Sequence, residues 1–220
     1  MDLLTFKLIL VFALFLLSLT IAAYSTWAER KVASIMQDRI GPNRSGPFGL
    51  LQPLADGGKF FFKEDFTPAN AEKFLFVLGP ALVMFISLIT GAVIPWGKSL
   101  NIAGTSYDLQ VANIDVGVLF IIGMASIGVY GIMIGGWASN NKYSLLGAIR
   151  ASSQMISYEL AMGLALLSII MMTGSLDLKE ITESQTNGKL WGFIPWVSGL
   201  NWNIFYQPIA FLVFIVAALA

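Results

Sequence analysis

The sequence predicts an all-α polytopic membrane protein with four full spans, a truncated fifth span and an interfacial amphipathic helix after the first span. Hydrophobic residues make up 56% of its 220 residues and charged residues only 12%, with a mean hydropathy of +0.75. Soluble domains carry about 25% charged residues, so this composition is typical of a chain that lies in lipid. The apolar runs are also long enough for helices that cross a bilayer, which takes about 20 residues. We therefore expect a single membrane domain over residues 1–220.

Five apolar runs account for the predicted spans. The first run is too long for a cleaved signal peptide and has no small-residue cleavage pattern, so we interpret it as a retained helix. The third run is rich in glycine, and Gly131 and Gly135 are spaced to allow close helix approach. The last run is too short for a crossing, which leads us to expect a fragment of a longer protein. The spans are expected at residues 3–26, 74–96, 115–138, 144–173 and 205–220.

Lysine and arginine are unevenly divided between the two ends of the spans. With alternating crossings, residues 27–73 and 139–150 lie on the same side of the membrane, and they hold nine of the thirteen basic residues. Such an excess marks the cytoplasmic side. We therefore expect a charged cytoplasmic loop over residues 27–73 and an N-terminus on the outside.

Cysteine and histidine are both absent from the sequence. Their absence excludes disulfides, thiolate-held iron–sulfur clusters, histidine-ligated haem and the usual zinc sites, and we expect no metal site. It also excludes catalysis by a cysteine or histidine nucleophile. If the chain takes part in redox chemistry, the electron carriers must belong to other subunits or to a diffusible cofactor. The net charge of zero gives no indication of nucleic-acid binding.

Residues 29–65 are too charged to cross a membrane and too numerous for a simple connector. They include six basic and five acidic residues. A loop of this kind at a membrane surface favours a site or docking surface over a purely solvated loop. Apolar residues recurring every three or four positions predict an amphipathic helix over residues 48–63, with Gln52, Asp56, Lys59 and Lys63 on its polar side. Pro53 and the glycines at 57 and 58 are expected to kink or loosen this helix.

Two arginines beside the amphipathic helix point to a ligand. Arg30 and Arg39 follow the first span, where their guanidinium groups can hold a polar head group while an apolar tail lies along the phenylalanines at 60–62. The same arginines can also anchor ordinary phospholipid head groups. Residue chemistry alone favours neither interpretation.

Glu159 is an ionisable residue well inside the predicted fourth span. Such residues are costly in hydrocarbon, and they are candidates for proton relays. Burial disfavours the charged carboxylate, so this position suits the uptake and release of a proton. Ser152 and Gly163 share its helical face, and the glycine leaves room for water or a partner helix. The alternative is a neutral glutamic acid that only ties helices together.

Two long motifs in this sequence resemble one protein family. They are ERK…QDRIGPNRSGPFGLLQPLADGGKFFFKE in the loop and GWASNNKYSLLGAIRASSQMISYELAMGLALL around the fourth span. Together they are similar to the H-type membrane subunit of the proton-translocating NADH:quinone oxidoreductases, respiratory complex I. The resemblance covers essentially the whole chain. It implies an all-helical component of the bacterial inner membrane that helps to form a quinone chamber and begins a proton path into the membrane.

The resemblance also implies roles for particular residues and partners. The bound substrate would be a quinone, either ubiquinone or menaquinone, and FMN and iron–sulfur clusters would reside on partner subunits of the hydrophilic and membrane arms. Glu159 would belong to the proton path with Arg150 and Tyr158 nearby, although Arg150 falls on nearly the opposite helical face and caps the cytoplasmic end. The quinone chamber would include Glu29, Arg30, Arg39, Asp56, Lys59 and Phe62.

Three other functions fit parts of the sequence. A membrane subunit of an energy-converting hydrogenase resembles the same family and handles no quinone. A stand-alone ion transporter also uses a buried glutamate and broken helices, but it predicts an inverted repeat and charges on several helices, which we do not observe in the sequence. A structural anchor for a peripheral arm leaves Glu159 unexplained.

Overall fold

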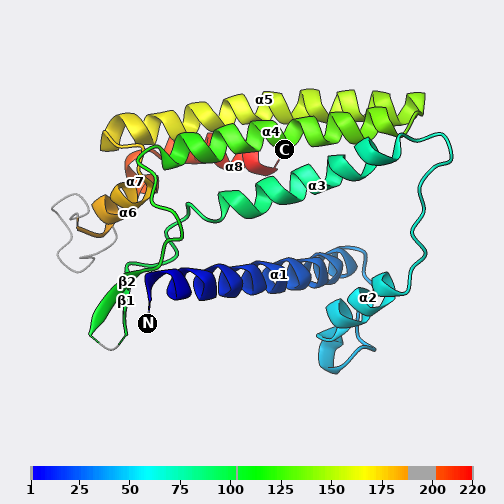
Figure 1. The fold of residues 1–220 in the computed structure, drawn as a ribbon, viewed down its shortest axis with the longest axis horizontal. Helices are drawn as coiled ribbons and strands as arrows, with labels where there is room; N and C mark the ends of the chain where they lie inside the picture. The colour runs from blue at the N-terminus through cyan, green and yellow to red at the C-terminus, as the bar shows by residue number, and fades with distance from the viewer. Residues whose placement is uncertain (1, 103, 188–201, 220) are drawn as a thin grey trace. The chain divides into compact units, whose positions relative to one another are not determined.

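The computed structural model describes residues 2–102, 104–187 and 202–219, and this part of the chain is mostly helical (Figure 1). It forms two compact units, Met1–Thr67 (unit 1) and Pro68–Ala220 (unit 2), which are described separately below. The prediction of a single membrane domain stays a prediction. The helices are α1 (Leu3–Met36), α2 (Gln52–Phe61), α3 (Lys73–Thr90), α4 (Gly117–Ala138), α5 (Lys142–Thr173), α6 (Leu178–Asn187), α7 (Asn203–Tyr206) and α8 (Pro208–Leu219).

The expected class of fold is confirmed. Helices α1, α3, α4 and α5 are each long and apolar enough to cross a membrane, and α8 is a shorter apolar helix. A helix satisfies all its backbone hydrogen bonds internally, which is what a segment in hydrocarbon requires. The predicted fifth span begins in the short helix α7, and Gln207 separates it from α8, which starts at Pro208.

In unit 1, α1 is longer than the predicted first span. The prediction ended at Thr26, where charged residues begin, but the helix continues to Met36. Glu, Arg, Lys and Ala are good helix formers, so leaving the apolar region does not end the helix. The chain turns where the backbone N–H of Arg39 donates to the carbonyl of Ser34, 2.9 Å away. The first part of the predicted loop 27–73 is therefore helical.

The amphipathic helix α2 is shorter than predicted at both ends. Phe48 lies in a 3-10 turn (Pro47–Gly49) with a positive φ of 55°, and the α-helix starts at Gln52. Pro53 is in the first turn, where proline is tolerated because its missing N–H has no helical partner. The expected kink at Pro53 was therefore wrong, since the proline begins the helix. Gly49 has a φ of 78°, and a Cβ there would collide with the carbonyl of Pro42.

In unit 2, α4 packs against both α3 and α5, and α8 packs on α5 (Figure 1). Glycines allow α3 and α4 to approach closely. A Cβ added to Gly79 of α3 would lie 2.9 Å from the carbonyl oxygen of Gly131 and 3.1 Å from the Cα of Gly135. The sequence prediction of close packing at this glycine pair is thus confirmed, and α3 supplies the partner surface.

A small β-hairpin occupies the connection between α3 and α4, where only a polar segment was predicted. Strands β1 (Ser99–Ile102) and β2 (Thr105–Asp108) pair antiparallel, with Ser99 opposite Asp108. The hairpin is tied to the rest of unit 2 by the Lys179 ammonium of α6, which lies 3.0 Å from Asp108 Oδ2. Helix α3 also ends at Thr90, before the predicted end at residue 96, because Gly91 and the later Pro95 do not favour its continuation.

Candidate functional site

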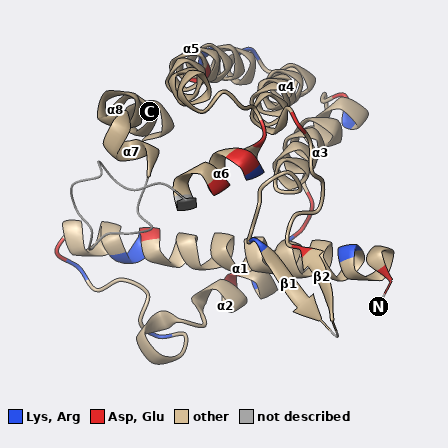
Figure 2. Ribbon diagram, turned by 90° about the vertical axis from the view of Figure 1, so that its left-hand side faces the viewer, with Lys and Arg blue, Asp and Glu red and all other residues tan. Residues whose placement is uncertain are grey.

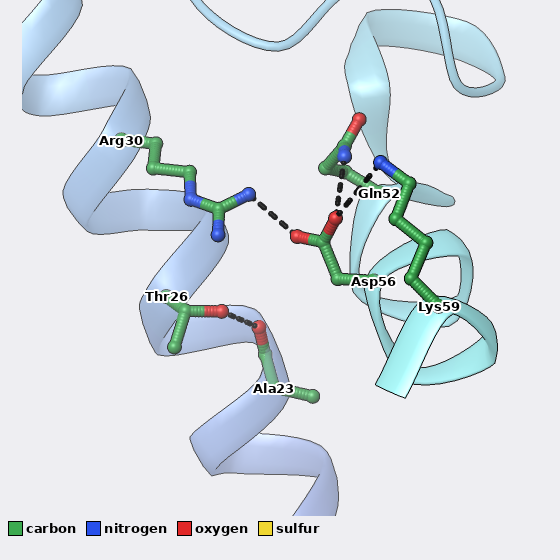
Figure 3. A network of polar contacts seen from close by, with 6 residues as sticks. All are labelled: Ala23, Thr26, Arg30, Gln52, Asp56 and Lys59. Atoms are coloured by element: carbon green, nitrogen blue, oxygen red, sulfur yellow. Dashed lines mark hydrogen bonds and ion pairs between the residues drawn. The ribbon is translucent and has the colours of Figure 1, made fainter. Parts of the chain in front are cut away.

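The first candidate site is the Asp56 cluster in unit 1, which consists of Asp56 and the three side chains that surround it (Figure 3). Arg30 Nη1 on α1 donates to Asp56 Oδ2 at 2.5 Å, and Gln52 Nε2 donates to Oδ1 at 2.9 Å. Lys59 Nζ lies 3.9 Å from Oδ1. Gln52, Asp56 and Lys59 share one side of α2 because they are spaced four and three residues apart. This is the polar side that the sequence predicted.

The partners of Asp56 hold it in the charged form. The hydrogen bond from Gln52 lowers the pKa of Asp56 most, followed by the hydrogen bond from Arg30 and the positive charges of Arg30 and Lys59. Because these effects exceed the cost of burial, the carboxylate is ionised at neutral pH. The cluster therefore presents a fixed arrangement of one acid and two bases.

Not all the predicted unit 1 residues join the Asp56 cluster. Arg39 lies beyond the end of α1, and its Nε donates to Gln37 Oε1 at 2.7 Å. Glu29 is exposed on α1, and Phe62, at the C-terminal end of α2, is 94% exposed. Phe60 and Phe61 are exposed with it, so α2 presents apolar rings next to its charged side chains.

The second candidate site lies in unit 2 and contains Glu159. Its side chain is half-buried on α5, and the hydroxyl of Ser126 on α4 donates to Glu159 Oε1. The same hydroxyl lies 3.1 Å from the backbone carbonyl of Ile122, one turn earlier in α4. Ser126 and Glu159 are 33 positions apart in the sequence, so packing of α4 against α5 creates the pair.

A cavity of about 830 Å³ lies beside this pair, between α4 and α5. Its wall is mostly apolar, and Ser126, Ser152 and Glu159 contribute polar groups to it. Ser152 is only 3% exposed, and its Oγ has no hydrogen-bond partner among the described residues. Gly163 lines the same cavity, and a Cβ there would meet open space. The predicted face of Ser152, Glu159 and Gly163 is thus confirmed.

The other two residues implied in the proton path lie apart from the cavity wall. Arg150 is exposed on α5 and Tyr158 is half-buried on the same helix. In contrast, Ser126 was not predicted from the sequence, although it contributes to the wall and binds Glu159 directly. The available signal was that Ser126 is the only serine in α4, a helix without any charged residue (Figure 2).

What this arrangement can do chemically follows from its surroundings. A carboxyl group next to a hydroxyl and an open space can bind or release a proton, and water in that space can carry it. These features define the class of protein: a polytopic helical membrane protein with an ionisable group inside a span.

The particular family follows from comparison with known proteins. A family model described as NADH dehydrogenase matches residues 8–220, and the chain belongs to this family. It is 58% identical over 214 residues to an H subunit (number 1) of the NADH-quinone oxidoreductase of Cytophaga hutchinsonii. The matched region covers 97% of this chain and 59% of that protein.

Other relatives show a similar pattern. The H subunit of the Flavobacterium psychrophilum enzyme is 56% identical over 214 residues, with 97% of this chain and 59% of that protein covered. An H subunit (number 1) of the Geobacter metallireducens enzyme is 49% identical over 207 residues, with 94% of this chain and 59% of that protein covered. The chain thus spans about three fifths of the length of these relatives. The family resemblance that the two sequence motifs indicated is confirmed.

Proposed function

We propose that this chain is part of the H-type membrane subunit of a proton-translocating NADH:quinone oxidoreductase. In this role it helps to form the quinone chamber and couples quinone reduction to proton movement. The family match and the names of the relatives support this function over a role in a hydrogenase. Electrons from NADH arrive through FMN and iron–sulfur centres on partner subunits, which suits a chain without cysteine or histidine.

Unit 1 supplies the quinone-facing groups in this proposal. A quinone head group offers carbonyl acceptors, for which the cations of Arg30 and Lys59 are suitable donors. The exposed rings of residues 60–62 suit the apolar tail. Arg39, Glu29 and Asp56 complete the charged lining, and Asp56 keeps Arg30 in position through their 2.5 Å contact.

Unit 2 supplies the proton-carrying group in this proposal. The single observation that carries this part is the placement of Glu159, which lies inside an apolar span, bound to Ser126 and beside a cavity. A carboxyl in that setting is expensive to maintain for structural purposes alone. Arg150 and Tyr158, on the same helix, flank the path. Quinone reduction consumes protons and changes local charge, and a change in the protonation of Glu159 transmits that event into the membrane.

The orientation proposed for the chain follows from its basic residues. Residues 27–73 and 139–150, which hold nine of the thirteen lysines and arginines, face the cytoplasm. The N-terminus then lies outside a bacterial inner membrane. The partners are the other subunits of the complex, quinone and lipid.

The proposal is tested by Glu159→Gln in the full-length protein, assembled in its membrane complex. The amide cannot release a proton, so NADH-driven proton translocation into vesicles should fall roughly a hundred-fold, and quinone reduction should fall with it. Glu180→Gln in α6, outside the spans, is the matched control and should leave both rates unchanged. Normal translocation and normal quinone reduction in Glu159→Gln would remove the proposed role of Glu159.

A further inference from the structure

The hydroxyl of Ser126 lies between two hydrogen-bond acceptors on different helices. One is the backbone carbonyl oxygen of Ile122, 3.1 Å away, and the other is Glu159 Oε1 on α5. A serine hydroxyl has one proton to donate and two lone pairs that accept. It can therefore donate fully to only one of these acceptors at a time, and its oxygen can accept a hydrogen bond from another donor.

This position differs from that of the other hydroxyls in the spans whose contacts the structure describes. Ser18, Ser168 and Thr173 each donate to a carbonyl of their own helix, which is the ordinary arrangement for such residues in apolar helices. Ser126 also has the choice of its own helix, through Ile122, but it reaches a carboxyl group on a neighbouring helix as well.

We infer that Ser126 is a positioning residue whose hydroxyl rotates between two partners as Glu159 gains and loses its proton. When Glu159 is ionised, the Ser126 O–H donates to Glu159 Oε1. When Glu159 is protonated, its own O–H donates to Ser126 Oγ, and the Ser126 O–H turns to the carbonyl of Ile122. No covalent bond of Ser126 breaks, since its proton stays on Oγ throughout. The proton that Glu159 releases passes to water in the adjacent cavity. The inference rests on the proposed function, because it assigns Ser126 a part in the same proton step.

The physical reason is the cost of unsatisfied polar groups away from water. A buried donor or acceptor that loses its partner costs about 1–3 kcal/mol, and more if it is charged. A partner that could only donate would suit the carboxylate and leave the protonated acid without an acceptor. Ser126 suits both states because Ile122 receives its proton in the second one. Each form of Glu159 thus keeps a hydrogen bond, so neither protonation state carries the cost of an unpaired polar group.

The test compares Ser126→Ala with Ser126→Thr in the full-length protein within its membrane complex. Alanine removes the hydroxyl, whereas threonine retains it. Ser168→Ala is the matched control, because Ser168 lies on α5 and donates only to Ala165 of its own helix among the described contacts. The readouts are NADH-driven proton translocation and the infrared C=O stretch of protonated Glu159, identified as the band that Glu159→Gln removes.

In Ser126→Ala we expect the Glu159 band to move to higher frequency, because the protonated carboxyl has lost its acceptor. Translocation should fall about ten-fold, the effect of one lost hydrogen bond to an ionisable group. Ser126→Thr should restore both readouts, and Ser168→Ala should alter neither. An unshifted band in Ser126→Ala would overturn the inference, and so would the lack of any band that depends on Glu159.

The two proposals can fail separately. If Glu159→Gln translocates protons normally, the proposed role of Glu159 in translocation is wrong. The frequency of the Glu159 C=O band alone tests whether Ser126 contacts protonated Glu159, whatever the translocation rate. A shifted band with unchanged translocation in Ser126→Ala would overturn the positioning role while leaving the proposed function in place.

Discussion

Two carboxyl groups in this chain are held in opposite ways. Asp56 in unit 1 is surrounded by Arg30, Lys59 and the amide of Gln52. Glu159 in unit 2 has a hydrogen bond from the neutral hydroxyl of Ser126 and lies beside a mostly apolar cavity. The first carboxylate is compensated by positive charge at a water-accessible surface, and the second belongs to a helix that is long and apolar enough to cross the membrane.

The difference shows how surroundings assign roles to the same chemical group. Nearby cations and donors stabilise the charged form of Asp56, so its charge is permanent at neutral pH. A neutral hydroxyl can bond either form of Glu159 but cannot neutralise its charge. Asp56 is therefore suited to holding cations in position, whereas under the proposed function Glu159 is the group that changes its charge during turnover.

Asp56→Asn should have a larger effect than the variants of Ser152 and Lys179 described below. It leaves Arg30 and Lys59 without their central anion, so their positions and any quinone contact loosen. We expect the apparent KM for quinone to rise about ten-fold, equivalent to losing one charged hydrogen bond. Steady-state quinone titrations measure this. The number of protons translocated per NADH should stay unchanged, because Asp56 does not change its charge.

The matched control is Asp38→Asn, which neutralises an exposed acid in the turn after α1. Asp38 has a positive φ of 50°, a conformation that asparagine adopts readily. This variant should leave the quinone KM as it is. An altered proton yield in Asp56→Asn with a normal quinone KM would reverse the assigned roles of the two carboxyls.

The lowered pKa of Asp56 predicts the pH range of its contribution. Because the folded value lies below the ordinary 3.8, the ion pairs stabilise unit 1 fully above that value. The contribution is lost as the pH falls through the lowered folded pKa. The effect of Asp56→Asn should thus be constant over the neutral range, which the same titrations at several pH values check.

Ser152→Ala should have an intermediate effect, confined to the proton-carrying side. Its buried hydroxyl has no partner among the described residues, so we expect it to hold water in the cavity beside Glu159. Without that water, proton translocation should slow about three-fold. The quinone KM should stay unchanged, and the thermal unfolding midpoint should not fall. The control is Ser153→Ala, which changes the exposed residue next to Ser152. A loss of stability at normal translocation would make Ser152 a structural residue only.

Lys179→Met should give the smallest effect, because it removes an ion pair with Asp108 that is largely accessible to solvent. The hydrogen bond to Asp108 raises the pKa of Lys179, so the pair contributes below the ordinary value of 10.5 and is lost as the pH rises through the folded value. Exposed pairs contribute at most about 1 kcal/mol. Amide hydrogen exchange in β1 and β2 should therefore quicken only a few-fold at neutral pH, with turnover unchanged. A large loss of turnover would show that the hairpin matters to function.

Much of the fold could be predicted from the sequence because of one constraint. A long apolar run in lipid must be a helix, since no water is present to satisfy its backbone groups. That rule located α1, α3, α4 and α5. Because an ionisable side chain is costly in hydrocarbon, the sequence also identified Glu159 as a candidate functional residue. The spacing of Gln52, Asp56 and Lys59 likewise predicted their shared face on α2.

Other features depended on contacts between elements and could not be predicted. The end of α1, the start of α2 and the hairpin β1–β2 are set by turns and tertiary hydrogen bonds outside the apolar region. Helix α4 is apolar on every side, so its sequence does not reveal which side faces α5.

The apolar pattern is a property of the chain itself, and it determined the class of protein and its spans. The pairing of Ser126 with Glu159, the cavity beside them and the link from Arg30 to Asp56 were decided by tertiary structure. The physical reason is that burial in lipid acts on each segment separately. A hydrogen bond between helices depends instead on how each helix is rotated and aligned against its neighbour.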